Sequence, residues 1–426
     1  MSIIHDLLRD VPIPRMVHAR QAFDDERLKD IEGAVRIQLG RPEISSKIRP
    51  EMRIAITCGS RGIDNYAQVI RTVVQFCKGR GAKPFIFPAM GSHAGSQAQG
   101  QKEICESYGV TEEYCGCPIL SSMETVQIGT TDIGVPAYID KTALQADGII
   151  VINRIKAHPG FTGKYESGLM KMMVIGMGKQ VGAATCHQFG YGKFPVLLDA
   201  IGRMILQRAP ILCGVGLIEN AYDKTRYIFG LTPEEIPQRE PELLTLSKAN
   251  MPRLLAGSCD VLVVDRMGKD ISGSGMDANI TGRSGSPYKK GTGFCASRVV
   301  TLSLTPESHG SMGGVGNADI INKRIFEQGD LELTYPNSIT HTCVRADAIP
   351  MMMDTDKLVI QCALKTCGCA DLGRPEIIRI LDTLHLKDLF VSEALAERLT
   401  GIPGIFIDGE PAPWRFGPND DVTFDW

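Results

Sequence analysis

The 426-residue sequence has no excess of charge of either sign: 46 lysines and arginines stand against 49 acids, and the net charge is −3. The lack of a basic excess argues against nucleic-acid binding, and there is no acidic tail. No apolar run reaches the roughly 18–20 residues that a membrane helix needs. The opening MSIIHDLLRDVPIPR has acids and prolines where a signal peptide would be apolar. These absences predict a cytoplasmic protein that binds neither nucleic acid nor membrane.

The sequence also lacks a dense cysteine framework, an internal repeat and a low-complexity segment. Its 13 cysteines are scattered, and CGC occurs at 115–117 and 367–369. Neither pair has the spacing of a structural zinc knuckle. We therefore interpret the cysteines as buried, reduced thiols.

Strand and helix patterns alternate in the first half of the chain. Apolar runs rich in β-formers predict strands at 52–59, 83–90 and 148–153. Amphipathic spacing predicts helices between and after them, at 63–81, 96–109 and 194–209. This alternation predicts an α/β fold with a mostly parallel sheet flanked by helices. Ligands of such sheets bind at the loops that follow the strands.

A polar helical stretch at 232–253 and a new strand at 259–265 place a domain boundary near 250. We predict an N-terminal α/β domain over 1–250 and a second α/β domain over 255–402. Helices are expected within 374–399. The turn-rich tail, 403–426, is expected to pack back on the first domain.

Three predicted strand-end loops carry residues suited to chemistry. They are SRG with Arg61, GSHAG with His93, and RIKAHPG with Lys156 and His158. The carboxyl ends of parallel strands share one edge, so these side chains should converge. Two imidazoles across a substrate suit proton removal on one face and delivery on the other.

The stretch 152–190 adds Lys171 and His187, separated mainly by glycine and methionine. In one straight helix these two residues would lie roughly 24 Å apart. Gly176, Gly178 and Gly182 can break the helix and bring them to one site. We expect His187, Lys171 and the histidines of the strand-end loops to line one cleft between the two domains, with Arg61 at its edge. The methionines are interpreted as apolar packing rather than as metal ligands.

Two other interpretations of these glycines stay open: purely structural glycines and a nicotinamide site. GMGKQVG is one residue off the dinucleotide fingerprint, and no acidic residue follows at the distance that a ribose contact needs. GFTGKY lacks the spacing of a P-loop and has no Ser or Thr after the lysine.

Taken together, GSRGI, GSHAG, KAHPGFTGKYESGLMK and CHQFG resemble the nickel-dependent lactate racemase family. The resemblance covers about 50–280. Its main mark is a histidine, a glycine-rich bend ending in lysine, and a histidine sixteen residues further on, here His158, Lys171 and His187. Arg61 and His93 precede them. The combination is specific, although no single piece is.

The resemblance implies a nickel-pincer nucleotide, whose pyridinium ring carries two thio groups that bind nickel. By position, Lys171 anchors one thio group and His187 is the nickel ligand. His93 and His158 are then the two acid/base residues. The family racemises 2-hydroxy acids by hydride removal and return.

The first loop and the second domain supply the remaining implied site residues. Ser60 and Arg61 would contact the cofactor, and Arg61 also the substrate. GMDANITGRSGSP keeps the Asp and Asn of a D-x-N element but replaces the residues that hold lactate in the family. Asn279 and Arg283 are the substrate-binding candidates, and Arg283 could hold a carboxylate or simply be a solvated loop residue. Lactate is therefore not the expected substrate.

The resulting hypothesis is a divergent racemase or epimerase of a 2-hydroxy acid larger than lactate, such as a sugar acid or a hydroxy-diacid, that depends on cofactor-synthesis enzymes. The alternatives are a non-redox homolog that binds a nucleotide or an acid, and a nicotinamide-dependent oxidoreductase.

Overall fold

The computed structural model describes residues 3–290, 293–369, 371–423 and 426. The chain forms two compact units. Unit 1 consists of Met1–Phe23, Pro159–Phe161 and Pro252–Trp426, and unit 2 of Asp24–His158 and Thr162–Met251. Within the described ranges, no helix is long and apolar enough to cross a membrane.

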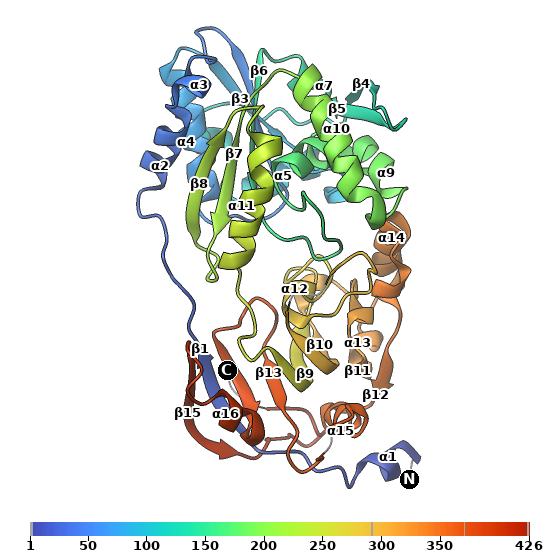
Figure 1. Cartoon of the computed structure of the whole chain (residues 1–426). Coiled ribbons are helices and arrows are strands. Elements are labelled where there is room, and N and C mark those ends of the chain that lie inside the picture. Colours follow the sequence, from blue (N-terminus) through green and yellow to red (C-terminus); the bar gives the residue numbers. More distant parts are fainter. Residues whose placement is uncertain (1–2, 291–292, 370, 424–425) are drawn as a thin grey trace. The chain divides into compact units, whose positions relative to one another are not determined.

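Unit 2 is built on a five-stranded sheet in the order β3-β2-β6-β7-β8 (Figure 1). The pairs β3-β2, β2-β6 and β6-β7 are parallel, and β8 is antiparallel to β7. The strands of the sheet are β2 (Arg53–Cys58), β3 (Lys83–Pro88), β6 (Gly148–Arg154), β7 (Ile211–Glu219) and β8 (Thr225–Leu231). Strands β4 (Thr125–Thr130) and β5 (Pro136–Asp140) form a separate antiparallel pair.

Helices cover both faces of this sheet because its strands are apolar on both faces. Helices α2 (Ile31–Leu39) and α4 (Tyr66–Gly79) pack together on one side, and α10 (Phe194–Arg208) and α11 (Ile236–Asn250) lie on the other (Figure 1). Three further segments follow one another before α10: α8 (Leu169–Lys171), the π-helical turn η2 (Met172–Gly176) and α9 (Lys179–His187). The remaining helical elements are α3 (Pro42–Ser45), η1 (Ala94–Ser96), α5 (Ala98–Ser107), α6 (Glu112–Cys115), α7 (Lys141–Leu144) and η3 (Tyr191–Lys193).

Unit 1 holds an eight-stranded mixed sheet in the order β12-β11-β10-β9-β13-β14-β1-β15. The first five strands in this order are parallel, and the other three are antiparallel to their neighbours. The strands are β1 (Met16–Gln21), β9 (Ser258–Met267), β10 (Cys295–Leu304), β11 (Ile320–Asn322), β12 (Met351–Met353), β13 (Ile377–Ile380), β14 (Asp388–Ser392) and β15 (Ile405–Ala412). The helical elements are α1 (Ile3–Leu8), α12 (Ala278–Thr281), η4 (Pro306–Ser308), η5 (Val315–Asn317), α13 (Lys323–Glu327), α14 (Leu331–His341), η6 (Val344–Asp347), α15 (Asp356–Thr366) and α16 (Glu393–Leu399).

The predicted fold class is confirmed: both units are α/β, and the sheet of unit 2 is mostly parallel. The two units divide the chain differently from the predicted domains. Residues 16–21 form β1, which pairs with β14 and β15 in unit 1. The tail, predicted to belong with the first domain, contributes β15 to unit 1.

The prediction of helices within 374–399 is correct only for α16 at its end, because two strands occupy the earlier part. IIRI at Ile377–Ile380 is a fully buried strand, and β14 follows it. Short apolar runs of this kind give no periodicity, so flanking helical patterns dominate the sequence signal.

Candidate active site at the sheet edge of unit 2

The carboxyl ends of three parallel strands meet the segment that carries Lys171. After β2, a carbon added at Gly59 would lie 2.9 Å from Cε of Met172. After β3, the N–H of Gly91 donates to the carbonyl of Gly176 (3.2 Å). On β6, Nδ2 of Asn153 donates to the carbonyl of Gly168 (2.8 Å). Elements α8 and η2 therefore lie across the edge of the sheet where α/β proteins bind ligands.

Lys171 has the electrostatics of a reactive amine. Burial and the positive charge of Arg61 lower the pKa of Lys171 to about 8, and the carboxylate of Glu166 partly opposes this shift. Burial and the charge of Arg154 also lower the pKa of Arg61. The interaction of Arg61 with Tyr108 raises this pKa and partly offsets the shift. Arg154 itself is paired with Glu219. Lys171, on α8, and Arg61, on the loop after β2, are thus two cations within electrostatic range of each other.

The loop after β3 presents His93 at the surface. Nδ1 of His93 lies 2.6 Å from the carbonyl of Met90, so this nitrogen is the donor. In the neutral ring, Nε2 is then the nitrogen without a proton. The buried side chain of Gln101 holds the same loop by donating to the carbonyls of Gly91 (2.9 Å) and His93 (3.2 Å). The neighbouring predicted site residue Ser60 accepts a hydrogen bond from Tyr108 through its carbonyl (3.0 Å).

His158 lies on the loop after β6 and is buried. Its backbone N–H donates to Oε2 of the fully buried Glu166 (2.7 Å). The negative charge of Glu166 is paired with Lys248, whose Nζ lies 2.6 Å from Oε1 of Glu166. The ring of His158 lies 5.6 Å from the ring of Tyr191, edge to face.

His187 ends α9 and contacts the same tyrosine. Its ring lies 6.1 Å from Tyr191 and 4.9 Å from Phe194, the first residue of α10. Met170, next to Lys171, packs on α10 at Gly202. Phe194 and Gly202 are eight helical positions apart, roughly 12 Å. The chain therefore brings His158 and His187 to one aromatic cluster, and α10 supports both Lys171 and His187.

The bend between Lys171 and His187 exists, but glycine does not supply its left-handed residue. Lys179 does, with φ +53°. A carbon added at Gly182 would lie only 3.2 Å from the carbonyl oxygen of Val174. Eight residues of straight helix would separate these positions by roughly 12 Å. The chain has therefore turned sharply, as the predicted shared site requires.

The predicted substrate-binding residues Asn279 and Arg283 belong to unit 1. Asn279 lies on α12, and its Nδ2 donates to Asp277 (2.8 Å). The guanidinium of Arg283 donates to Asp319 (3.0 Å) and to two backbone carbonyls. The terminal nitrogens of Arg283 therefore already have partners within unit 1. Arg283 also lines a cavity of about 250 Å³ with Asn317 and Arg345.

Three site-supporting residues were not predicted: Asn153, Lys179 and Glu240. Glu240 is buried on α11, and its Oε2 accepts the N–H of Met170 (3.0 Å) directly before Lys171. Burial raises the pKa of Glu240 to about 7, against the opposing effect of the Met170 and Leu169 N–H groups. A glutamate and a lysine in polar, helical sequence look solvent-exposed, so only their tertiary contacts reveal them.

The edge offers one imidazole, that of His187, and one amine, that of Lys171, as the groups that a nickel-pincer nucleotide would need. Among the described residues, there is no group of three or more His, Cys, Asp or Glu side chains that could hold a metal ion. A pincer that already binds nickel through sulfur and carbon needs one imidazole, which His187 can provide. It also needs an amine for its thio group. Within the described part of the chain, Lys171 makes no hydrogen bond or ion pair.

The fold is that of an α/β protein and is similar to the fold of lactate racemase. The lactate racemase apoprotein from Thermoanaerobacterium thermosaccharolyticum aligns with 87% of this chain and 99% of its own, with a TM-score of 0.53 and 14% identity. At that identity the likeness shows a common fold, and it agrees with the resemblance seen in the motifs. The model of the family described as "Domain of unknown function (DUF362)" matches residues 54–268, about half of the chain. The chain belongs to this family. Among curated proteins, none matches the sequence.

Proposed function

We propose that this chain is a racemase or epimerase of a 2-hydroxy acid that uses a nickel-pincer nucleotide. The observation that carries the proposal is the place and state of Lys171. Its amine has a pKa of about 8, and its segment touches the ends of β2, β3 and β6. Half of such amines are uncharged near pH 8, so the nitrogen of Lys171 could attack the carbon of a thiocarboxylic acid, whose C–O bond would break and release water as the thioamide forms.

Each residue would have a distinct task. Lys171 would hold the nucleotide, His187 would ligate nickel, and Arg61 would bind a phosphate or the substrate carboxylate. When bound, the cofactor supplies an acceptor and donor of hydride. His93 and His158 would take the hydroxyl proton of one enantiomer each and return it to the product. Two bases are needed because the two enantiomers present their hydroxyl groups differently.

We further propose a substrate longer than lactate. The segment after Asn279 supplies small residues, hydroxyl groups and cations: its glycines and serines would leave volume for a longer chain, and its hydroxyl groups could bond to hydroxyl groups or a second carboxylate on that chain. Because Arg283 is engaged within unit 1, the proposal rests on this volume and no longer on a clamp by Arg283. In a screen of hydroxy acids, lactate should not give the highest kcat/KM, and α-deuterium should be largely retained in the product. Complete exchange with solvent would mean proton abstraction at carbon instead.

The decisive experiment is intact mass and metal analysis of protein made together with enzymes that synthesise the cofactor. We expect a mass increment and bound nickel in the wild type. K171R should lose the increment, because guanidinium cannot form the thioamide. Lys164→Arg, at an exposed lysine of the same glycine-rich stretch, is the matched control and should keep both. Neither increment nor nickel in the wild type would refute the proposal in favour of a nucleotide- or acid-binding protein. Absorbance changes with a nicotinamide and a ketoacid would favour an oxidoreductase.

A further inference from the structure

Lys179 combines two unfavourable features in one residue. Its side chain is fully buried and its backbone is left-handed, with φ +53°. Left-handed backbone is costly for any residue with a Cβ atom. Buried ion pairs are often no more stabilising than the apolar side chains that could replace them. Stability alone therefore does not explain a lysine at this position.

The Lys179 ammonium makes one ion pair and two hydrogen bonds with different parts of unit 2. Nζ lies 3.2 Å from Oδ2 of the fully buried Asp140, at the end of β5. It also donates to the carbonyl of Pro88, the last residue of β3, and to Oε1 of Gln101 (3.4 Å). Burial lowers the pKa of Lys179 and raises that of Asp140, and their mutual attraction opposes both shifts.

The contact with Gln101 determines which way its amide group faces. With Oε1 turned to Lys179, Nε2 of Gln101 faces the carbonyls of Gly91 and His93 and donates to both. Without the ammonium, Oε1 would lose its donor and the amide could rotate. A rotated amide would set oxygen against the two carbonyls and release the loop.

From these contacts, we propose that Lys179 is a positioning residue. Through Gln101 and the carbonyl of Pro88, it holds the Gly91–His93 loop against η2, beside Lys171. The same residue begins α9, which ends at His187. One side chain thus fixes the base of the His93 loop and the turn that leads from Lys171 to His187. The acid/base role of His93 rests on the proposed function, whereas the positioning does not.

Two variants separate positioning from stability. K179M with D140N removes both charges, and Asn keeps the acceptor for the N–H of Ala143 that Asp140 now provides (2.9 Å). Gln101→Leu cuts the link to the loop but leaves the ion pair intact. If the double variant fails to fold, Gln101→Leu alone tests the proposal. Gln99→Leu, at an exposed position of the same helix, is the matched control.

The measurements use the chain without cofactor. We expect amide hydrogens of residues 91–97 to exchange about tenfold faster in both variants. In ¹⁵N spectra, the ratio of the two His93 tautomers should change as the bond from Nδ1 to Met90 loosens. His93→Gln assigns the signal. Unchanged exchange and tautomer ratio in a folded variant would overturn the proposal.

With cofactor loaded, Gln101→Leu, which leaves Lys179 and the turn to His187 in place, should lose kcat while the mass increment, nickel and KM stay at wild-type values. If the wild type takes up no cofactor, the proposed function fails, but exchange and tautomer data still decide the role of Lys179. A loss of stability without any change at His93 would make Lys179 merely structural.

Discussion

Glu240 gives a quantitative test of the packing beneath Lys171. Its carboxyl group is 1% exposed and has a pKa of about 7, raised from 4.5 mainly by burial. Because the folded state holds the proton more tightly than the unfolded state, protonation stabilises unit 2. This stabilisation is fully present below pH 4.5 and is lost as the pH rises through 7.

The size of the effect follows from the two pKa values. A rise from 4.5 to about 7 corresponds to about 3 kcal/mol in the free energy of unfolding. Between pH 5 and pH 8, about 2–3 kcal/mol of this should disappear. Glu240→Gln keeps an acceptor for the N–H of Met170 but cannot ionise. Relative to the wild type, the variant should therefore gain about 2–3 kcal/mol on going from pH 5 to pH 8.

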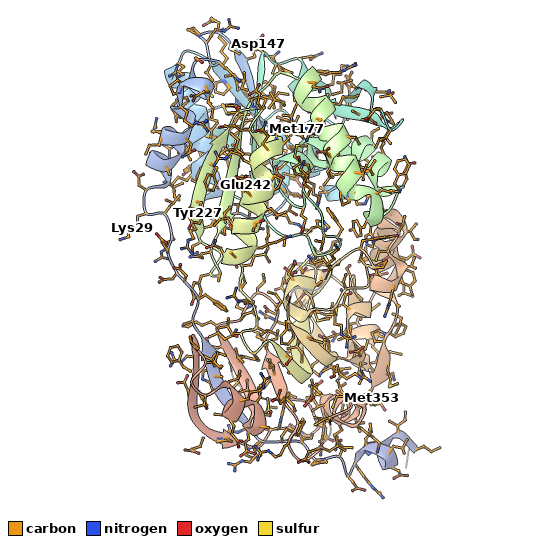
Figure 2. All side chains as sticks on the ribbon, in the orientation of Figure 1. Lys29, Asp147, Met177, Tyr227, Glu242 and Met353 are labelled. Carbon is orange, nitrogen blue, oxygen red and sulfur yellow. The ribbon has the colours of Figure 1, made fainter. Side chains whose placement is uncertain are left out.

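The assay is denaturant unfolding at both pH values, followed by circular dichroism. Both tryptophans, Trp414 and Trp426, belong to unit 1, so fluorescence reports that unit separately. Glu242→Gln is the control for loss of a charge, since Glu242 is exposed on the same helix (Figure 2). Taking the difference between two pH values cancels any fixed cost of the amide. A difference that stays constant from pH 5 to pH 8 would refute a buried, ionisable Glu240.

Three further predictions concern the same sheet edge. Lys171 should be acylated with a midpoint near pH 8, measured by peptide mass spectrometry, and R61Q should raise that midpoint because it removes a neighbouring cation. A midpoint unaffected by R61Q would mean that the charge of Arg61 does not lower the pKa of Lys171. H187A should lose nickel from the loaded protein and lower the free energy of unfolding by about 1 kcal/mol; equal nickel in variant and parent would exclude His187 as the ligand. Gly168→Ala should cost about 1–3 kcal/mol by denaturant unfolding, because the new carbon would lie 2.3 Å from Oε1 of Glu240; a neutral result would mean that α11 yields there.

The sequence predicted the sheet edge well because strand ends have a local signature. A short apolar run followed by glycine places Arg61, His93 and His158 on loops of one edge, and the parallel pairing of β2, β3 and β6 follows from the intervening helices. The bend after Lys171 was also predicted, although its left-handed residue was assigned to glycine instead of Lys179.

The residues that support the site could not be predicted, because their roles depend on partners far away in the chain. Glu240 meets Met170 across 70 positions, and Lys179 meets Pro88 across 91. Both side chains are polar residues in helices, where a solvated face is the ordinary interpretation. β1 was missed for a related reason: six residues gain their strand character only from pairing with β14 and β15.

The position of β1 between β14 and β15 affects the order in which the chain can fold. Unit 2 is inserted between the first strand of unit 1 and the rest of that unit, so it can fold during synthesis while β1 waits for its neighbours. β1 has no partner until residues 388–412 have left the ribosome. A fragment that begins near residue 250 would leave one edge of β14 and one edge of β15 unpaired, and unpaired edges invite aggregation. Expression of unit 1 by itself therefore calls for fusing residues 3–23 to the segment that starts at Pro252.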